Sequence, residues 1–280
     1  MTATTSSRRL AAAGESRRQR IADAFSRAAP GYDGAAQLQQ AVADDLLARL
    51  PQPDSCRALV DIGCGTGYLV SRLAERHGGL AIGLDIAPGM LDQARRRHAG
   101  RSIHWVTGCA ESMPLADGSA DLMVSSLAVQ WCDSLEAFLG EAARVVAPGG
   151  WLGFTTLCEG TLEELQWAWQ QVDGETHVNE FLAEARLVET LRAPGWQSAE
   201  VTMTTRRTHH ATPAETMRAL KRIGANTMTA SAASAASAGA AGGLFGRRRF
   251  DRLAQALERW REPAGIPTRY RVATVLMQRR

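Results

Sequence analysis

Features that indicate a secreted, metal-binding or membrane protein are scarce in this sequence of 280 residues. Its five cysteines form no C-x-x-C pair and stand at no metal-ligand spacing with histidine. This disfavours a disulfide framework and a structural zinc site, and it fits a reducing cytoplasm. Residues 1–20 lack the continuous apolar segment of a secretory signal. The longest uncharged stretch, residues 223–246, is mostly alanine, serine, glycine and threonine, so we expect no membrane span.

The charged residues are distributed unevenly along the chain. Residues 28–205 contain 11 basic and 23 acidic residues, whereas residues 206–280 contain 15 basic and 4 acidic ones. Such a basic segment could meet nucleic acid, a membrane or an acidic protein, or it could only keep the chain soluble. Aromatic residues are sparse within it, which argues against stacking on single-stranded nucleic acid.

Short apolar runs alternate with helical patterns in the first part of the chain. Strands are predicted at residues 58–62, 80–86, 103–106, 120–129 and 151–157, and helices at 17–29, 37–50, 68–77, 88–98 and 135–146. The order of these elements is typical of a doubly wound α/β fold with a mostly parallel sheet.

The alternation of strands and helices breaks down after the fifth predicted strand. Helices are then predicted at 162–172, 178–191, 214–223 and 248–260, strands at 199–208 and 269–277, and a low-complexity loop at 229–243. We expect residues 1–50 to form a helical segment that caps the site and residues 51–280 to form the main domain. Helical insertions at about 158–198 and 209–267 would follow the fifth and sixth strands.

A glycine-rich turn follows the first predicted strand, and its glycines are spaced G-x-G-x-G. A dinucleotide fingerprint needs G-x-G-x-x-G, and no G-K-[ST] follows that could hold a triphosphate. Asp85 ends the second predicted strand, where doubly wound folds place the carboxylate that accepts from two ribose hydroxyls. Asp61 adds a second negative charge, which suits a cationic ligand and repels a pyrophosphate. The residues therefore predict a site for a nucleoside without a phosphate chain.

Taken together, these motifs resemble those of class I S-adenosylmethionine-dependent methyltransferases. DIGCGTG resembles their first motif, residues 108–115 their adenine-side motif, and residues 144–154 the segment entering their fifth strand. The family often has an acidic residue at the position of Cys109, so here the backbone of Ala110 is expected to recognise adenine alone. The resemblance implies a Rossmann-like fold and S-adenosyl-L-methionine as cofactor. It implies these cofactor-binding residues: Asp61, Gly63, Cys64, Gly65, Gly67, Asp85, Ile86, Met90, Cys109, Ala110 and Ser126.

Several further segments are similar to the malonyl-[acyl-carrier protein] O-methyltransferases of biotin synthesis. They include FSRAAPGYD, SSLAVQWC, LKRIGAN and TRYRVATVLMQR, and the similarity covers nearly the whole chain from about residue 17. It implies a cytoplasmic enzyme that methylates the free carboxylate of malonyl-acyl carrier protein and uses no metal. A carboxylate is already ionised at neutral pH, so the reaction needs orientation and exclusion of water rather than a general base.

Within this resemblance, the expected catalytic residues are Tyr32, Trp131 and Lys221. Tyr32 and Trp131 would form the pocket walls, with the Tyr32 hydroxyl donating to the malonyl carboxylate. Lys221, the only lysine of the chain, and Arg222 are candidates to anchor the malonyl charge, and Gln130 completes the expected substrate site. Alternatively, Tyr32 and Trp131 could be packing residues, and Lys221 and Arg222 a solvated helix face.

Three other functions stay open at this point. The chain could methylate a small free acid or a quinone, it could bind a nucleoside without turnover, or its basic segment could bind nucleic acid. Because carrier proteins are acidic, the basic segment 206–280, with three arginines at 247–249 at the start of a predicted helix, is the expected docking surface for the acyl carrier protein.

Overall fold

The computed structural model describes residues 17–51, 56–175, 177–197, 199–222 and 244–280. The chain divides into two compact units. One consists of Met1–Thr156, Ala185–Thr202 and Ala273–Arg280, and the other of Leu157–Glu184 and Met203–Val272. The second unit includes most of the residues of the two predicted insertions, 158–198 and 209–267. The predicted loop at 229–243 lies outside the described residues.

A seven-stranded sheet in the order β3-β2-β1-β4-β5-β7-β6 organises the fold. Its strands are β1 (Ala58–Ile62), β2 (Leu80–Asp85), β3 (Ile103–Thr107), β4 (Ala120–Ser126), β5 (Val146–Leu157), β6 (Glu200–His210) and β7 (Ile266–Gln278). The neighbours from β3 to β5 pair in parallel. The predicted doubly wound, mostly parallel α/β fold is therefore confirmed.

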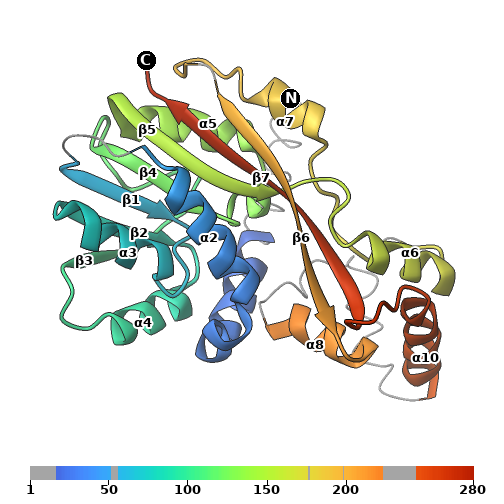
Figure 1. The fold of residues 1–280 in the computed structure, drawn as a ribbon. Coiled ribbons are helices and arrows are strands. Elements are labelled where there is room, and N and C mark those ends of the chain that lie inside the picture. The colour runs from blue at the N-terminus through green and yellow to red at the C-terminus, as the bar shows by residue number, and fades with distance from the viewer. Residues whose placement is uncertain (1–16, 52–55, 176, 198, 223–243) are drawn as a thin grey trace, which may run out of the picture. The chain divides into compact units, whose positions relative to one another are not determined.

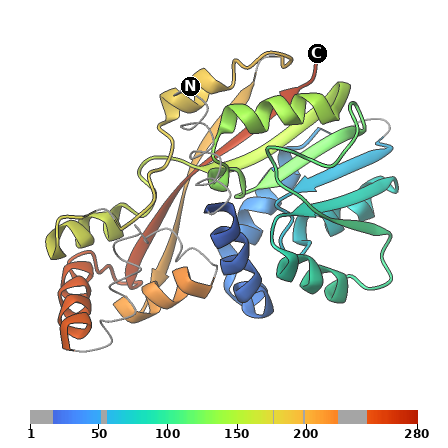
Figure 2. The ribbon, with the colours of Figure 1, turned by 180° about the vertical axis from the view of Figure 1, so that it is seen from behind.

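Helices cover both faces of the sheet in the first unit. They are α2 (Gln37–Arg49), α3 (Tyr68–His77), α4 (Pro88–Arg97) and α5 (Leu135–Val145), and residues 17–28 form a further helix. Figures 1 and 2 show α2 and α3 on one face and α5 on the other. The central strands β1 and β4 are almost entirely buried, as expected for a parallel sheet that is covered on both sides.

The helix predicted at 178–191 is correct only in its second half, because Glu184–Thr190 (α7) is helical and residues 178–183 are not. The chain before α7 pairs instead with the segment that follows β5: Leu182 forms a parallel bridge with Cys158, and its carbonyl accepts from the Glu159 N–H at 3.1 Å. An apolar pattern over a short run does not reveal such a pairing with a distant residue.

The boundaries of the fourth and fifth strands also differ from the prediction. β4 ends at Ser126 because Leu127 has a φ of +49°, and residues Val129–Trp131 form a 3-10 helix (η3). β5 begins at Val146 rather than at residue 151, since Val146 pairs with Ala120 before a register shift. The Pro-Gly-Gly sequence inside β5 usually indicates a turn, so the prediction placed the start of the strand after it.

The second unit contains α6 (Glu163–Val172), α8 (Pro213–Arg222) and α10 (Leu244–Glu258). Helices α6 and α10 pack together, and Trp167 of α6 meets Trp260 edge to face with ring centroids 6.0 Å apart. No helix in the described part of the chain combines the length and the apolar character needed to cross a bilayer.

The core between α5 and the sheet predicts a large stability effect at Phe138. Its side chain is fully buried and meets Phe154 of β5 edge to face at 5.8 Å. We expect Phe138→Ala to lower the free energy of unfolding by about 3–5 kcal/mol, because it removes apolar contacts and leaves a cavity. Urea unfolding measures this, with Val188→Ala at an exposed position as the control. Equal losses in the two variants would contradict this packing.

Candidate functional site

A cavity of the first unit, which we call the main cavity, lies at the carboxyl ends of β1, β2 and β4. Its walls come from the glycine-rich turn, the end of β2, the segments 108–111 and 125–132, and the N-terminal helix at 17–28. A second cavity shares Tyr32, Gly63, Gly65 and Ser126 with the first and is also lined by Asp61 and Cys64. Ligands of open parallel sheets bind at this edge of the sheet.

The glycine-rich turn holds Asp85 by its backbone. Gly63 and Gly65 have φ values of +66° and +54°, a left-handed conformation that side chains disfavour. The Gly65 N–H donates to Asp85 Oδ2 at 2.8 Å, and the Ala87 N–H donates to Oδ1 at 2.8 Å. Burial raises the pKa of Asp85 above its ordinary value of 3.8, and these backbone donors offset only part of that rise. Each carboxylate oxygen can still accept one further hydrogen bond from a ligand hydroxyl.

Asp61 lies at the wall of the second cavity and is only 2% exposed. Its carboxyl group accepts a hydrogen bond from the Val70 N–H at 3.1 Å. Burial raises its pKa to about 8, and the negative charge of Asp85 acts in the same direction. A positively charged ligand group beside Asp61 would reverse this effect and favour the carboxylate.

The helix at 17–28 brings residues to the cavity that sequence reasoning missed, namely Arg18, Ile21 and Phe25. Arg17 attaches this helix by donating to Asp133 Oδ1 at 2.7 Å and to the Trp131 carbonyl at 2.9 Å. The Phe25 ring meets Trp131 edge to face at 5.3 Å. The sequence predicted a helical segment that caps the site, but a helical pattern does not reveal which of its residues face a ligand.

Tyr32 lines both cavities from the short segment between the 3-10 helices Ala29–Gly31 and Asp33–Ala35. Its neighbour Asp33 accepts from the Thr66 hydroxyl at 2.6 Å and pairs with Arg97, which ties this segment to the glycine turn. Burial, together with Asp85 and Asp33, raises the pKa of Tyr32. Its hydroxyl therefore stays protonated and can donate.

Most of the predicted site residues line one of the two cavities. They are Tyr32, Asp61, Gly63, Cys64, Gly65, Asp85, Ile86, Met90, Cys109, Ala110, Ser126 and Trp131. The structure thus brings together residues from six separate segments. Their roles toward a ligand stay predictions.

Four predicted residues are not among those lining either cavity. Gly67, at a φ of +84°, is the N-cap residue directly before α3, and a Cβ there would meet the Trp105 ring, so it serves the turn itself. The Gln130 side chain donates to the Leu127 carbonyl at 2.7 Å. Lys221, which is exposed, and Arg222 end α8 in the second unit. The predicted ligand contacts of these four residues stay predictions.

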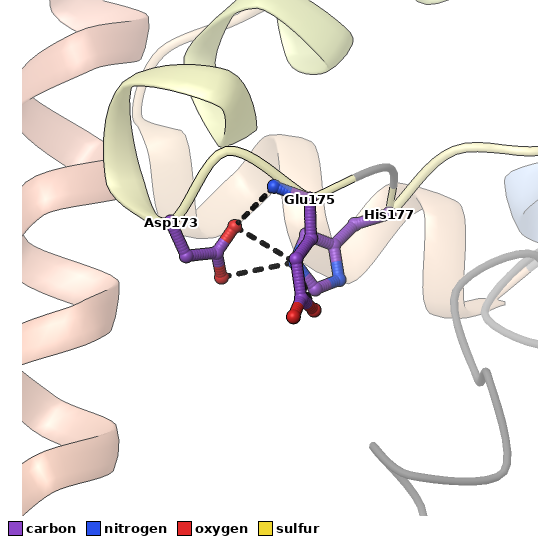
Figure 3. Close-up of side chains that lie close together, drawn as sticks. All are labelled: Asp173, Glu175 and His177. Atoms are coloured by element: carbon purple, nitrogen blue, oxygen red, sulfur yellow. Dashed lines mark hydrogen bonds and ion pairs between the residues drawn. The ribbon is translucent and has the colours of Figure 1, made fainter.

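In the second unit, Asp173, Glu175 and His177 lie close enough together to hold a metal ion (Figure 3). His177 Nε2 is 3.1 and 3.0 Å from the two carboxylate oxygens of Asp173. Arg249 pairs with Asp173, lies 2.9 Å from His177 Nε2 and stacks over the Trp169 ring. Because a guanidinium already supplies the positive charge, the cluster links α6 to α10 rather than offering an open metal centre.

Comparison with known proteins gives three further findings. A methyltransferase domain family matches residues 60–154, which include the glycine turn and Asp85. The malonyl-[acyl-carrier protein] O-methyltransferase of Serratia marcescens is 45% identical over 208 residues, which are 74% of this chain and 79% of that protein. The biotin biosynthesis bifunctional protein BioHC of Cellvibrio japonicus is 41% identical over 255 residues, 91% of this chain. The chain spans about half the length of this bifunctional relative, 49%.

A solved structure with the same fold is the Haemonchus contortus phosphoethanolamine N-methyltransferase 2, in complex with phosphomonomethylethanolamine and S-adenosylhomocysteine. The match has a TM-score of 0.53 and 16% identity, and it covers 85% of this chain and 52% of that one. At this identity the similarity concerns the fold alone.

The raised pKa of Asp61 predicts a pH effect on stability. Between its ordinary value of 3.8 and about 8, the folded chain keeps a proton that the unfolded chain releases. The contribution of Asp61 to the free energy of unfolding is therefore fully present below pH 3.8 and is lost as the pH rises through about 8. Asparagine does not titrate, so only the native chain loses this contribution. We therefore expect the free energy of unfolding of Asp61→Asn, measured by urea unfolding, to rise relative to that of the native chain between about pH 5 and about pH 9. Parallel pH profiles for the two proteins would contradict the buried, protonated carboxyl.

Proposed function

Because the chain belongs to the family of malonyl-[acyl-carrier protein] O-methyltransferases, we propose that it transfers a methyl group to the free carboxylate of malonyl-acyl carrier protein. S-adenosyl-L-methionine is the proposed methyl donor. The proposal places the enzyme in biotin synthesis in the cytoplasm, with the acyl carrier protein as its partner and without a metal.

The observation that carries the proposal is the buried Asp85 carboxylate at the cavity wall. Its two oxygens each have one backbone donor, so they are oriented and can accept the two ribose hydroxyls of the cofactor. The side chains beside the glycine turn include the carboxyl groups of Asp61 and Asp85, which would repel a pyrophosphate. This supports a nucleoside ligand without a pyrophosphate.

Asp61 supports a ligand that carries positive charge. An α-amino group or a sulfonium near the second cavity would bring its carboxyl group to the charged form and recover part of the cost of burying it. A dinucleotide would bring two negative phosphates toward Asp61 and Asp85 instead, and this is electrostatically unfavourable.

When bound, S-adenosyl-L-methionine supplies an electrophilic methyl group on a positively charged sulphur. A carboxylate oxygen of the substrate forms the new C–O bond while the C–S bond breaks and its electron pair stays on sulphur. The substrate is already ionised, so the chain needs no general base for this step. Its task is to align oxygen and carbon at about 3–3.5 Å and to exclude water.

Tyr32 and Trp131 are the proposed residues for this alignment. Tyr32 lines both cavities and keeps its proton, so its hydroxyl can donate to one oxygen of the malonyl carboxylate and leave the other free. Trp131 lines the main cavity, and its ring is fixed by Phe25. Helix 17–28, which carries Phe25, would cap the site and keep water out.

Mass spectrometry of malonyl-acyl carrier protein tests the proposed function. After incubation with the enzyme and S-adenosyl-L-methionine, we expect the carrier protein to gain the mass of one methyl group. Acetyl-acyl carrier protein, which has no free carboxylate, is the matched control and should stay unchanged. A malonyl substrate that stays unmodified, or methylation of both substrates, would overturn the proposal.

Asp85→Ala should weaken binding of S-adenosylhomocysteine, measured by isothermal titration calorimetry. The expected loss is about 1.5–3 kcal/mol for each hydrogen bond to the charged carboxylate. Asp92→Ala is the control, because Asp92 is exposed on α4 and pairs only with Arg95 among the described residues. An unchanged affinity in Asp85→Ala would remove Asp85 from the ribose site.

Lys221→Ala tests the proposed anchor for the malonyl charge. We expect the KM for malonyl-acyl carrier protein to rise at least about tenfold and the KM for the cofactor to change little, because a cation partner is lost only for the substrate. Arg218→Ala, which removes an exposed cation one turn earlier on α8, is the control. Similar changes in the two KM values would assign Lys221 a role outside the substrate site.

A further inference from the structure

Glu111 places a carboxylate at the wall of the main cavity. Its side chain is 8% exposed, and it comes from the loop after β3. The Ser134 N–H donates to its Oε1 at 2.9 Å, which fixes the orientation of the carboxylate. The second oxygen, Oε2, lies 3.8 Å from Cys109 Sγ and 3.4 Å from Arg18 Nη2, and both of these residues line the cavity. Glu111 therefore lines the same wall as Cys109 and Arg18, and its Oε2 lies beside both of them.

The neighbours of Oε2 leave it able to accept a strong hydrogen bond. A thiol is a weak donor, and charge-assisted N–H···O bonds are usually 2.7–2.9 Å long. The separation from Arg18 is longer, because the same guanidinium nitrogen pairs with Asp133 Oδ2 at 3.0 Å. Glu111 thus combines a fixed orientation with an oxygen that lacks a close donor among the described residues.

The neighbouring position in the sequence cannot take this role. Cys109 lines the same wall, but a thiol is a poor acceptor. The Ala110 N–H can donate to a ring nitrogen of a bound base, but it cannot accept from an amino group. A buried amino group without an acceptor would weaken binding, so an adenine here needs an acceptor from another residue.

We propose that Glu111 Oε2 accepts a hydrogen bond from the exocyclic amino group of the cofactor's adenine. The inference rests on the proposed function and deepens it, because it names the residue that selects a 6-aminopurine. Ser134 is a positioning residue, since its backbone N–H fixes the carboxylate. Arg18 contributes by pairing with Asp133 and keeping only a long contact with Glu111.

Calorimetric titration of the full chain with two ligands tests this inference. The ligands are S-adenosylhomocysteine and its 6-deamino analogue, in which hydrogen replaces the amino group and the ring nitrogens are retained. We expect the native chain to bind S-adenosylhomocysteine about tenfold or more tightly than the analogue. In Glu111→Gln, the amide oxygen keeps the Ser134 N–H and the amide nitrogen faces the base, so this preference should disappear.

Glu189→Gln is the matched control, because it neutralises a carboxylate of α7 that is 65% exposed and lines neither cavity, and it should keep the preference for the amino group. If Glu111→Gln fails to fold, as judged by circular dichroism, Glu111→Asp serves in its place. It keeps the charge but shortens the side chain by one methylene, and it should reduce the preference several-fold.

Each other outcome counts against the inference. If the Glu111 variant keeps the preference, or if Glu189→Gln loses it as well, Glu111 does not accept from adenine, although the proposed function stands. A native chain that binds the two ligands equally also overturns the inference alone. A native chain that binds neither ligand overturns the proposed function as well.

Discussion

The site depends on a single constraint, the burial of the Asp85 carboxylate at the end of β2. A buried carboxylate is costly unless hydrogen-bond donors compensate, and two backbone N–H groups do so here. One of them comes from Gly65, so the donor is available only if the glycine turn adopts its left-handed conformation. The Leu84 carbonyl holds the same turn by accepting from the N–H groups of Gly63 and Cys64. The strand, the turn and the carboxylate therefore fix one another.

The parallel sheet places the buried Asp85 carboxylate beside the other residues of the site. Because β1, β2 and β4 run in the same direction, their carboxyl ends bring Asp61, Asp85 and Ser126 to one edge. The N-terminal helix then adds Arg18 and Phe25, and its ion pairs with Asp133 attach it to the segment that contains Trp131. The cavity thus consists of rigid strand ends on one side and a helix held by polar contacts on the other.

The sequence predicted the elements whose signals are local. The strand Ala58–Ile62 and the helix Tyr68–His77 have the predicted bounds. A glycine follows the strand, and glycines flank the helix at both ends. The position of Asp85 was also predicted, since a fixed distance along the chain separates it from the glycine turn. The family resemblance found from the motifs is confirmed by relatives that cover most of the chain.

The sequence did not reveal features that depend on distant contacts. The pairing of Leu182 with Cys158 lies in the first half of a segment that was predicted as one helix. Glu111 lies inside a motif that the sequence analysis recognised. Its orientation, however, depends on contacts with Ser134 and Arg18, which are 23 and 93 positions away in the chain. The raised pKa of Asp61 likewise results from burial, which spacing alone does not measure.

The central claim is that this cavity accepts a nucleoside without a phosphate chain. Calorimetric titration of the native chain with S-adenosylhomocysteine and, separately, with NADH tests it most directly. The account predicts saturable heat and a single binding site for S-adenosylhomocysteine, and no heat of binding for NADH. Binding of NADH in the absence of any binding of S-adenosylhomocysteine would contradict it.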